Sequence, residues 1–155
     1  MKKLFILGIM CFMALAINAQ SFVDLGLSSG TKWKTQNQSG LYTYSDAISM
    51  FGNNLPKKSQ WNELIIECVW EWTGSGYKVT GPNGNSIELP AEGRRFGSEP
   101  YVCDVGKFGC YWSSTRADAS YGPNSSWYLH FDSSHECVRD ESRGFGLSVR
   151  LVQNK

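Results

Sequence analysis

The chain has 155 residues, which is the size of a single domain. Its formal net charge is +1, whereas a typical nucleic-acid-binding protein has a large excess of basic residues, so we expect no nucleic-acid partner. With 16 Gly, 6 Trp and 7 Tyr but only 19% charged residues, the composition favours a loop-rich fold with β-strands over a helical bundle.

The first residues predict a signal peptide. Lys2 and Lys3 form a positively charged start, residues 4–17 are apolar, and a small-residue cleavage site follows. We therefore predict a signal peptide over 1–19 and a single domain over 20–155. The protein is expected to be exported to the medium, the cell surface or the periplasm, with no membrane insertion after the signal is removed.

A membrane anchor and a lipoprotein are the alternatives at this end of the chain. The apolar run is shorter than the roughly 20 residues that a spanning helix needs. Cys11 lies inside the apolar run and follows Met10, where a lipidation site would have a small residue. Ordinary export is therefore the preferred interpretation.

The first half of the domain predicts a hairpin and two short helices. Residues 21–37 read as two strands joined by a Ser-Ser-Gly turn. Residues 44–52 predict a helix with Ser45 as its N-cap and a glycine at its end. Residues 55–70 predict a second helix capped by Ser59. Its apolar face would be formed by Trp61, Leu64, Ile65 and Cys68.

The second half is dominated by strands and loops. An Asn83-Gly84 turn predicts a hairpin over residues 76–90. A long irregular stretch follows over 91–109. Further strands are expected at 110–115, 125–134, 136–142 and 145–153. The predicted fold class is therefore α+β, with two short helices and a β- and loop-rich C-terminal half.

Large aromatic residues are expected mainly in the core. Trp112 would anchor the strand "YWSST", and the same interpretation applies to Trp33, Trp61, Trp70 and Trp72. Arg150, between Val149 and Leu151, is expected to lie on the opposite side from these neighbours and to form a salt bridge near the N-terminal hairpin, with no functional role.

Four cysteines follow the predicted signal peptide, and export would permit disulfides among them. They are Cys68, Cys103, Cys110 and Cys137, which allow three connectivities. Cys103 and Cys110 flank a Gly-containing loop and are the candidates for a local bridge, while Cys68 could be a buried free thiol. No C-x-x-C spacing is present, so we predict no metal site and no cofactor.

A binding face is predicted over residues 116–143. If Trp127, Leu129 and Phe131 face the core, the intervening side chains of that strand face outward. Polar and aromatic residues of this kind are typical of recognition surfaces. The candidate ligand-binding residues are Tyr128, His130, Asp132, His135, Arg139, Asp140 and Arg143. The alternative is an ordinary solvated hairpin.

Catalytic and calcium-binding interpretations have weaker support. Ser113 or Ser114 could be combined with His130 and Asp132, but no nucleophile-elbow motif accompanies the serines. Asp132, with Asp140 and Glu141, could supply calcium ligands, but solvated carboxylates are the simpler interpretation. We therefore predict a non-catalytic domain with no catalytic residues.

Six phrases in order carry a resemblance to a known family. They are "FVDLGLSSGTKW", "LPKKSQWNEL", "CVWEWT", "GYKVTGPNGNSIELPAEGRR", "YWSST" and "GLSVRLV". Together they resemble the Fibrobacter succinogenes major paralogous domain family of secreted Bacteroidetes proteins, from Phe22 to Val152. Two features depart from the family pattern: Glu88 and Glu92 interrupt the fourth phrase, and the cysteines after residue 100 look particular to this chain.

The resemblance implies a C-type lectin-like fold, shared with formylglycine-generating enzymes and phage receptor-binding proteins. In that fold two helices flank small antiparallel sheets, and the N- and C-terminal strands pair. It implies an extracellular display scaffold whose C-terminal region contacts a glycan or protein ligand. Alternative functions are an enzyme of the formylglycine-generating type or another hydrolytic activity, and a structural envelope component.

Overall fold

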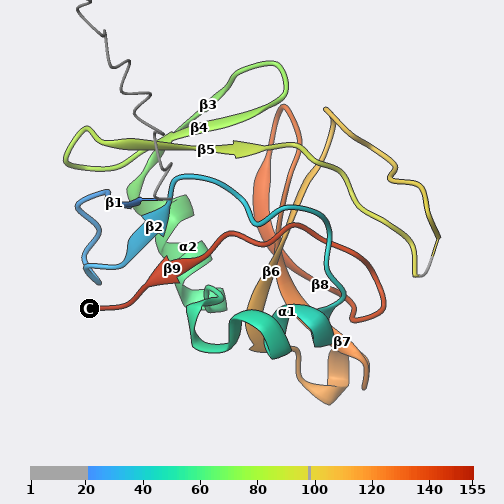
Figure 1. Ribbon diagram of the computed structural model, residues 1–155. Helices are drawn as coiled ribbons and strands as arrows, with labels where there is room; N and C mark the ends of the chain where they lie inside the picture. Colours follow the sequence, from blue (N-terminus) through green and yellow to red (C-terminus); the bar gives the residue numbers. More distant parts are fainter. Residues whose placement is uncertain (1–20, 98) are drawn as a thin grey trace, which may run out of the picture.

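The computed structural model describes residues 21–97 and 99–155 (Figure 1). The predicted signal peptide lies outside the described residues. The fold is α+β, as predicted: two short helices and three antiparallel sheets of three strands each. The elements are β1 (Phe22–Asp24), β2 (Lys32–Lys34), α1 (Tyr44–Phe51), the 3-10 turn η1 (Gly52–Asn54), α2 (Lys58–Glu67), β3 (Val69–Trp72), β4 (Gly76–Thr80), β5 (Ser86–Pro90), β6 (Gly109–Arg116), η2 (Ala119–Tyr121), β7 (Ser125–Phe131), β8 (Glu136–Ser142) and β9 (Val152–Gln153).

The first sheet joins the two ends of the domain in the order β1-β2-β9 (Figure 1). Val23 pairs with Trp33, which in turn pairs with Val152. The predicted N-terminal hairpin is confirmed, and its turn is closed by a hydrogen bond from Gly30 N to Leu27 O of 2.9 Å. Gly30 has a φ of 70°, a conformation that glycine adopts without strain. The pairing of terminal strands is the arrangement that the resemblance implies.

Both helices form where they were predicted, but both predicted caps are wrong. Thr43 caps α1, because its Oγ1 accepts a hydrogen bond from Asp46 N (3.3 Å). In α2, Lys57 is the N-cap and its backbone N–H donates to Gln60 Oε1 (2.8 Å). Ser45 and Ser59 therefore lie inside the first turns of their helices.

Strand β3 was not predicted: Val69 and Trp70 were assigned to the end of the second helix, and Glu71 and Trp72 to no element. α2 ends at Glu67, and the chain then turns directly into β3. Trp70 and Trp72 are half-buried, whereas Val69 and Glu71 are exposed, which is the two-residue period of a strand. β3 and the predicted β4–β5 hairpin form the second sheet.

The third sheet, in the order β6-β7-β8, separates two hydrophobic clusters. Tyr111, Leu129 and Phe131 belong to the cluster shared with α2 and the other two sheets. Cys110, Trp112 and Tyr128 belong to the cluster shared with α1 and the segment before β9, so the predicted core position of Trp112 is confirmed. Gly109 is required at the start of β6, because a Cβ there would collide with the Phe131 ring.

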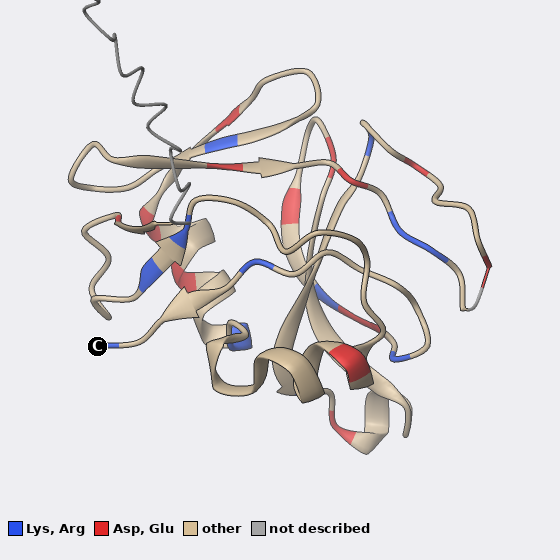
Figure 2. Cartoon of the chain, viewed as in Figure 1, with Lys and Arg blue, Asp and Glu red and all other residues tan. Residues whose placement is uncertain are grey.

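The last predicted strand, 145–153, forms only at its end as β9. The residues before β9 form only isolated β-bridges: Leu147 pairs with Tyr42, and Gly146 pairs with Arg95. Leu147 and Val149 are fully buried in this stretch, so the segment serves as a cover for the third sheet. Basic and acidic residues are interspersed over the whole fold (Figure 2).

Candidate functional site

The seven predicted site residues do not form one surface. Tyr128, His130 and Arg139 lie on one face of the third sheet, because Tyr128 pairs with Arg139 in register. Asp140 pairs with Trp127 and belongs to the opposite face. Asp132 and His135 lie in the β7–β8 turn, and Arg143 follows β8 at the far end of the sheet. The predicted binding face is therefore divided among separate places.

The prediction that Tyr128 and His130 face outward is wrong. Tyr128 is only 4% exposed and His130 only 9%. β7 is the central strand, and its second face is covered by α1, by the segment before β9 and by Phe108. A strand that is buried on both faces has no outward-facing set of side chains, so neither residue can contact a large ligand.

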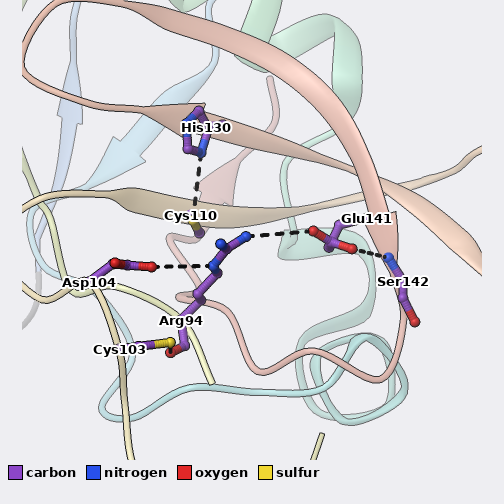
Figure 3. Close-up of polar contacts among 7 residues, drawn as sticks. All are labelled: Arg94, Cys103, Asp104, Cys110, His130, Glu141 and Ser142. Carbon is purple, nitrogen blue, oxygen red and sulfur yellow. Dashed lines mark hydrogen bonds and ion pairs between the residues drawn. The ribbon is translucent and has the colours of Figure 1, made fainter. Parts of the chain in front are cut away.

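Buried beneath this cover, Cys110 and His130 face each other across β6 and β7 (Figure 3). Cys110 Sγ and His130 Nδ1 are 3.8 Å apart. Burial raises the pKa of the Cys110 thiol to about 12, and burial together with the charge of Arg139 lowers the pKa of His130. Both groups are therefore neutral near pH 7, which is the opposite of a thiolate–imidazolium pair.

The side chain of Arg94 lies beside Cys110, between Asp104 and Glu141 (Figure 3). Its Nε lies 3.6 Å from Asp104 Oδ2, and its Nη1 lies 3.8 Å from Glu141 Oε2. Arg94 thereby ties the long 91–109 loop to the edge strand β8. Arg94, Asp104 and Glu141 thus form a charged cluster next to the hydrophobic cluster that contains Cys110.

The predicted Cys103–Cys110 disulfide is not formed, and the four described cysteines are free. Cys103 Sγ contacts the backbone carbonyl of Arg94 at 3.3 Å, whereas Cys110 points toward His130 (Figure 3). The two side chains are thus directed at different partners. Cys68 is free and half-buried at the end of α2.

We expect Cys110 to resist alkylation in the native protein. At pH 8, iodoacetamide should modify it at least about a thousandfold more slowly than in urea, because the thiolate is scarce and the side chain is fully buried. Site-resolved mass spectrometry over time measures the rate, with half-buried Cys103 and Cys137 as internal comparisons. Rapid native labelling of Cys110 would show an activated thiol and would favour the enzyme alternative.

The Ser–His–Asp combination is not assembled either. His130 lies opposite Cys110 in the register of the sheet, and the serines lie three and four positions further along β6. Ser113 Oγ accepts a hydrogen bond from Thr115 N (3.0 Å), and Ser114 N donates to Pro56 O (2.7 Å). Both serines thus have structural partners, Ser113 within its own strand and Ser114 in the segment before α2.

The β3–β4 turn, the β7–β8 turn and the loop before β6 lie near one another (Figure 1). Residues of these three loops line a surface pocket of about 450 Å³. We call it the tip pocket. Its lining residues are Trp72, Gly74, Gly106, Lys107, Phe108, Asp132, Ser133 and Ser134. The pocket thus combines two aromatic side chains with a carboxylate, hydroxyls and a cation.

Asp132 is the predicted site residue that lines the tip pocket. Its Oδ1 accepts hydrogen bonds from Ser134 N and Ser134 Oγ, both of 2.8 Å. These bonds lower the pKa of the Asp132 carboxyl group, so the group is ionised at neutral pH. The turn therefore holds a charged acceptor in a fixed orientation.

Trp72 forms the aromatic wall of the tip pocket and was assigned to the core by the sequence analysis. The assignment is half right, since the half-buried ring packs against Tyr77 (5.2 Å between centroids) and Phe131 (6.4 Å). The rest reaches the pocket because β3 is an edge strand. Phe108 and Lys107 lie in the irregular stretch, where no periodicity indicates orientation.

A larger groove of about 600 Å³ runs between residues 35–39 and β5. Glu88 and Glu92, the two departures from the family pattern, both line it. The buried Arg150 forms part of its floor and is held by Asn37 Oδ1, Lys34 O and Glu88 O. Its lining is mixed, with Ile87 and Pro90 among polar and charged residues, and includes no aromatic side chain.

The described residues contain no cluster of three or more His, Cys, Asp or Glu side chains arranged to hold a metal ion. Within residues 21–97 and 99–155, no helix is long and apolar enough to cross a membrane. Comparison with family models, curated proteins and solved structures gave no match. The family assignment therefore stays a prediction.

Proposed function

We propose that this protein is an exported, non-catalytic binding domain that recognises a glycan through the tip pocket. The observation that carries the proposal is the meeting of Trp72 and Asp132 in one pocket built by three loop tips. Loops fixed on a rigid scaffold are common carriers of binding function. A C-type lectin-like fold is part of the same proposal, supported by the pairing of β2 with β9.

The chemistry of the tip pocket suits a sugar. An aromatic ring packs against the apolar face of a pyranose, while ionised and hydroxyl oxygens bind its hydroxyl groups. Trp72 and Phe108 supply the rings, and Asp132 with Ser133 and Ser134 supplies the polar groups. A pocket with apolar walls and a few fixed polar groups is the usual form of a small-ligand site.

A protein ligand is the second candidate, and the exposed loop before β6 favours it. Phe96, Tyr101, Val102 and Val105 are 41–63% exposed on this one segment. Exposed apolar residues that gather in one place often mark interaction surfaces. The enzyme alternative has less support, because the Cys110 thiol is buried and neutral.

The test is binding of the purified protein to an array of neutral glycans, with calcium and with a chelator. We expect Trp72→Ala and Asp132→Asn each to weaken a positive signal roughly tenfold, since each removes one principal contact. Asp132→Asn keeps the hydrogen-bond acceptor of the turn and removes only the charge. The signal should persist in chelator, because Asp132 is the one carboxylate lining the pocket.

Asp140→Asn is the matched control, because Asp140 lies on β8 away from the tip pocket. Wild-type affinity in both pocket variants, with wild-type thermal stability, would refute the tip pocket as the binding site. No binding on the glycan array, together with binding to immobilised matrix proteins, would shift the proposal to the exposed loop.

A further inference from the structure

A second pocket lies at the other end of β7, beside α1. It has a volume of about 370 Å³. Its lining residues are Tyr44, Ser45, Ile48, Ser49, Arg116 and Arg143, so it contains two cations and no acidic residue. We call it the arginine pocket. It shares no residue with the tip pocket, and the inference drawn from it goes beyond the proposed function.

The fold brings the two arginines to the same residue of the central strand. Arg116, the last residue of β6, pairs with Ser126 in register. Arg143, just after β8, donates from Nε to Ser126 Oγ (3.0 Å) and from Nη2 to Ser125 O (3.0 Å). The guanidinium of Arg143 also lies 5.5 Å from the centre of the Tyr44 ring. One arginine is thus fixed and the other is exposed beside it.

The charges of these two arginines are not balanced by ion pairs in the described part of the chain. Ion pairs within 4.0 Å form there only between Arg94 and its two carboxylates, Asp104 and Glu141. Asp46, an exposed acid on α1, is hydrogen-bonded to Thr43 Oγ1 (2.7 Å) and does not line the pocket. Two like charges that share a pocket repel each other, and an anionic ligand would remove that repulsion.

We infer that the arginine pocket binds the carboxylate or sulfate group of an acidic saccharide. The planar guanidinium matches an oxyanion with paired hydrogen bonds, which makes arginine the preferred residue for such groups. Tyr44 and Ile48 give an apolar floor for the ring that carries the anion. Ser45 and Ser49 supply hydroxyls at the rim for its remaining oxygens.

The experiment is a calorimetric titration of the purified protein at low salt with an oligogalacturonate. Its fully methyl-esterified form is the uncharged control, and a sulfated oligosaccharide of equal length distinguishes the two anions. We expect the esterified probe to bind at least tenfold more weakly than the acid, and salt to weaken the binding of the acid. Binding of the carboxylate or of the sulfate probe supports the inference and identifies the anion; binding of neither overturns it.

Arg116→Gln is the principal variant, because Arg116 is exposed and its loss leaves the Arg143 contacts intact. Affinity for the anionic probe should fall about tenfold. The matched control is Arg139→Gln, an exposed arginine on β8 outside the pocket. Equal losses in both variants, or none in Arg116→Gln, would overturn the inference.

Trp72→Ala separates this inference from the proposed function. It should leave binding of the anionic probe unchanged, since Trp72 lines the other pocket. If Trp72→Ala abolished anion binding while Arg116→Gln did not, the anion would be bound in the tip pocket and the arginine pocket would be refuted.

Discussion

Replacing Trp61 by alanine should lower the free energy of unfolding by about 3–5 kcal/mol. Trp61 is fully buried on α2, with its ring 4.6 Å from Trp33 and 5.8 Å from Tyr111 between centroids. It therefore joins the helix to the first and third sheets at once. Its indole N–H donates to Trp112 O (3.3 Å), so the substitution also leaves a buried carbonyl without that donor.

Equilibrium unfolding in urea, followed by tryptophan fluorescence and by far-UV circular dichroism, measures the change. Ile66→Ala is the matched control on the same helix, because Ile66 is 80% exposed and its truncation should change stability by no more than about 0.5 kcal/mol. A loss for Trp61→Ala as small as that of the control would mean that neighbouring side chains fill the space, and that Trp61 is not a principal link between α2 and the two sheets.

The sequence predicts most elements because their signals are local. The Ser-Ser-Gly and Asn83-Gly84 turns, the glycine that ends α1 and the apolar face of α2 each depend on residues a few positions apart. The cap of α1 failed for a local reason too, since Thr43 and Ser45 both carry a hydroxyl that can accept a helix N–H. In α2 the N-cap Lys57 has no side-chain acceptor, and Gln60 bonds back to its N–H instead. α1 begins at Tyr44, which is also its first buried residue.

The predicted binding face failed because alternation along a strand does not reveal what covers each face. Trp127, Leu129 and Phe131 suggested one buried face, and Leu129 and Phe131 are indeed fully buried. Tyr128 and His130 carry polar groups, yet they are covered by segments that lie far away in sequence. Only the tertiary arrangement shows that β7 is central in its sheet.

The candidate sites were predicted in fragments. Asp132 and Arg143 were both selected from the sequence, but each lines a different pocket together with residues that were not selected. Trp72 and Tyr44 resemble core residues in the sequence, and Arg116 is one charged residue among many. Pockets form where distant loops meet, so the partners of a selected residue are set by the topology.

Replacing Arg150 by methionine should lower the free energy of unfolding by about 2–4 kcal/mol, which combines the loss of several charge-assisted hydrogen bonds. The sequence analysis expected a salt bridge of Arg150 near the N-terminal hairpin; the partner there is instead a backbone carbonyl, since Nη1 donates to Lys34 O at 2.7 Å. Nε donates to Asn37 Oδ1 (2.8 Å) and Nη2 to Glu88 O (2.6 Å). The side chain is 1% exposed, so one guanidinium joins the end of β2, the following loop and β5 from inside the fold.

The size of this effect depends on a balance. Burial lowers the pKa of Arg150, because desolvation destabilises the charged guanidinium in the folded protein. Urea unfolding of Arg150→Met and Arg150→Lys measures the net contribution of these hydrogen bonds to the free energy of unfolding. The control is Arg139→Met, since Arg139 is an exposed arginine on β8. Arg150→Lys should also be destabilised, because one ammonium group cannot reach three acceptors arranged around a planar fork. If Arg150→Met were as stable as the control, the desolvation of the guanidinium would equal the gain from its three hydrogen bonds, and the β2–β5 connection would rest on apolar packing alone.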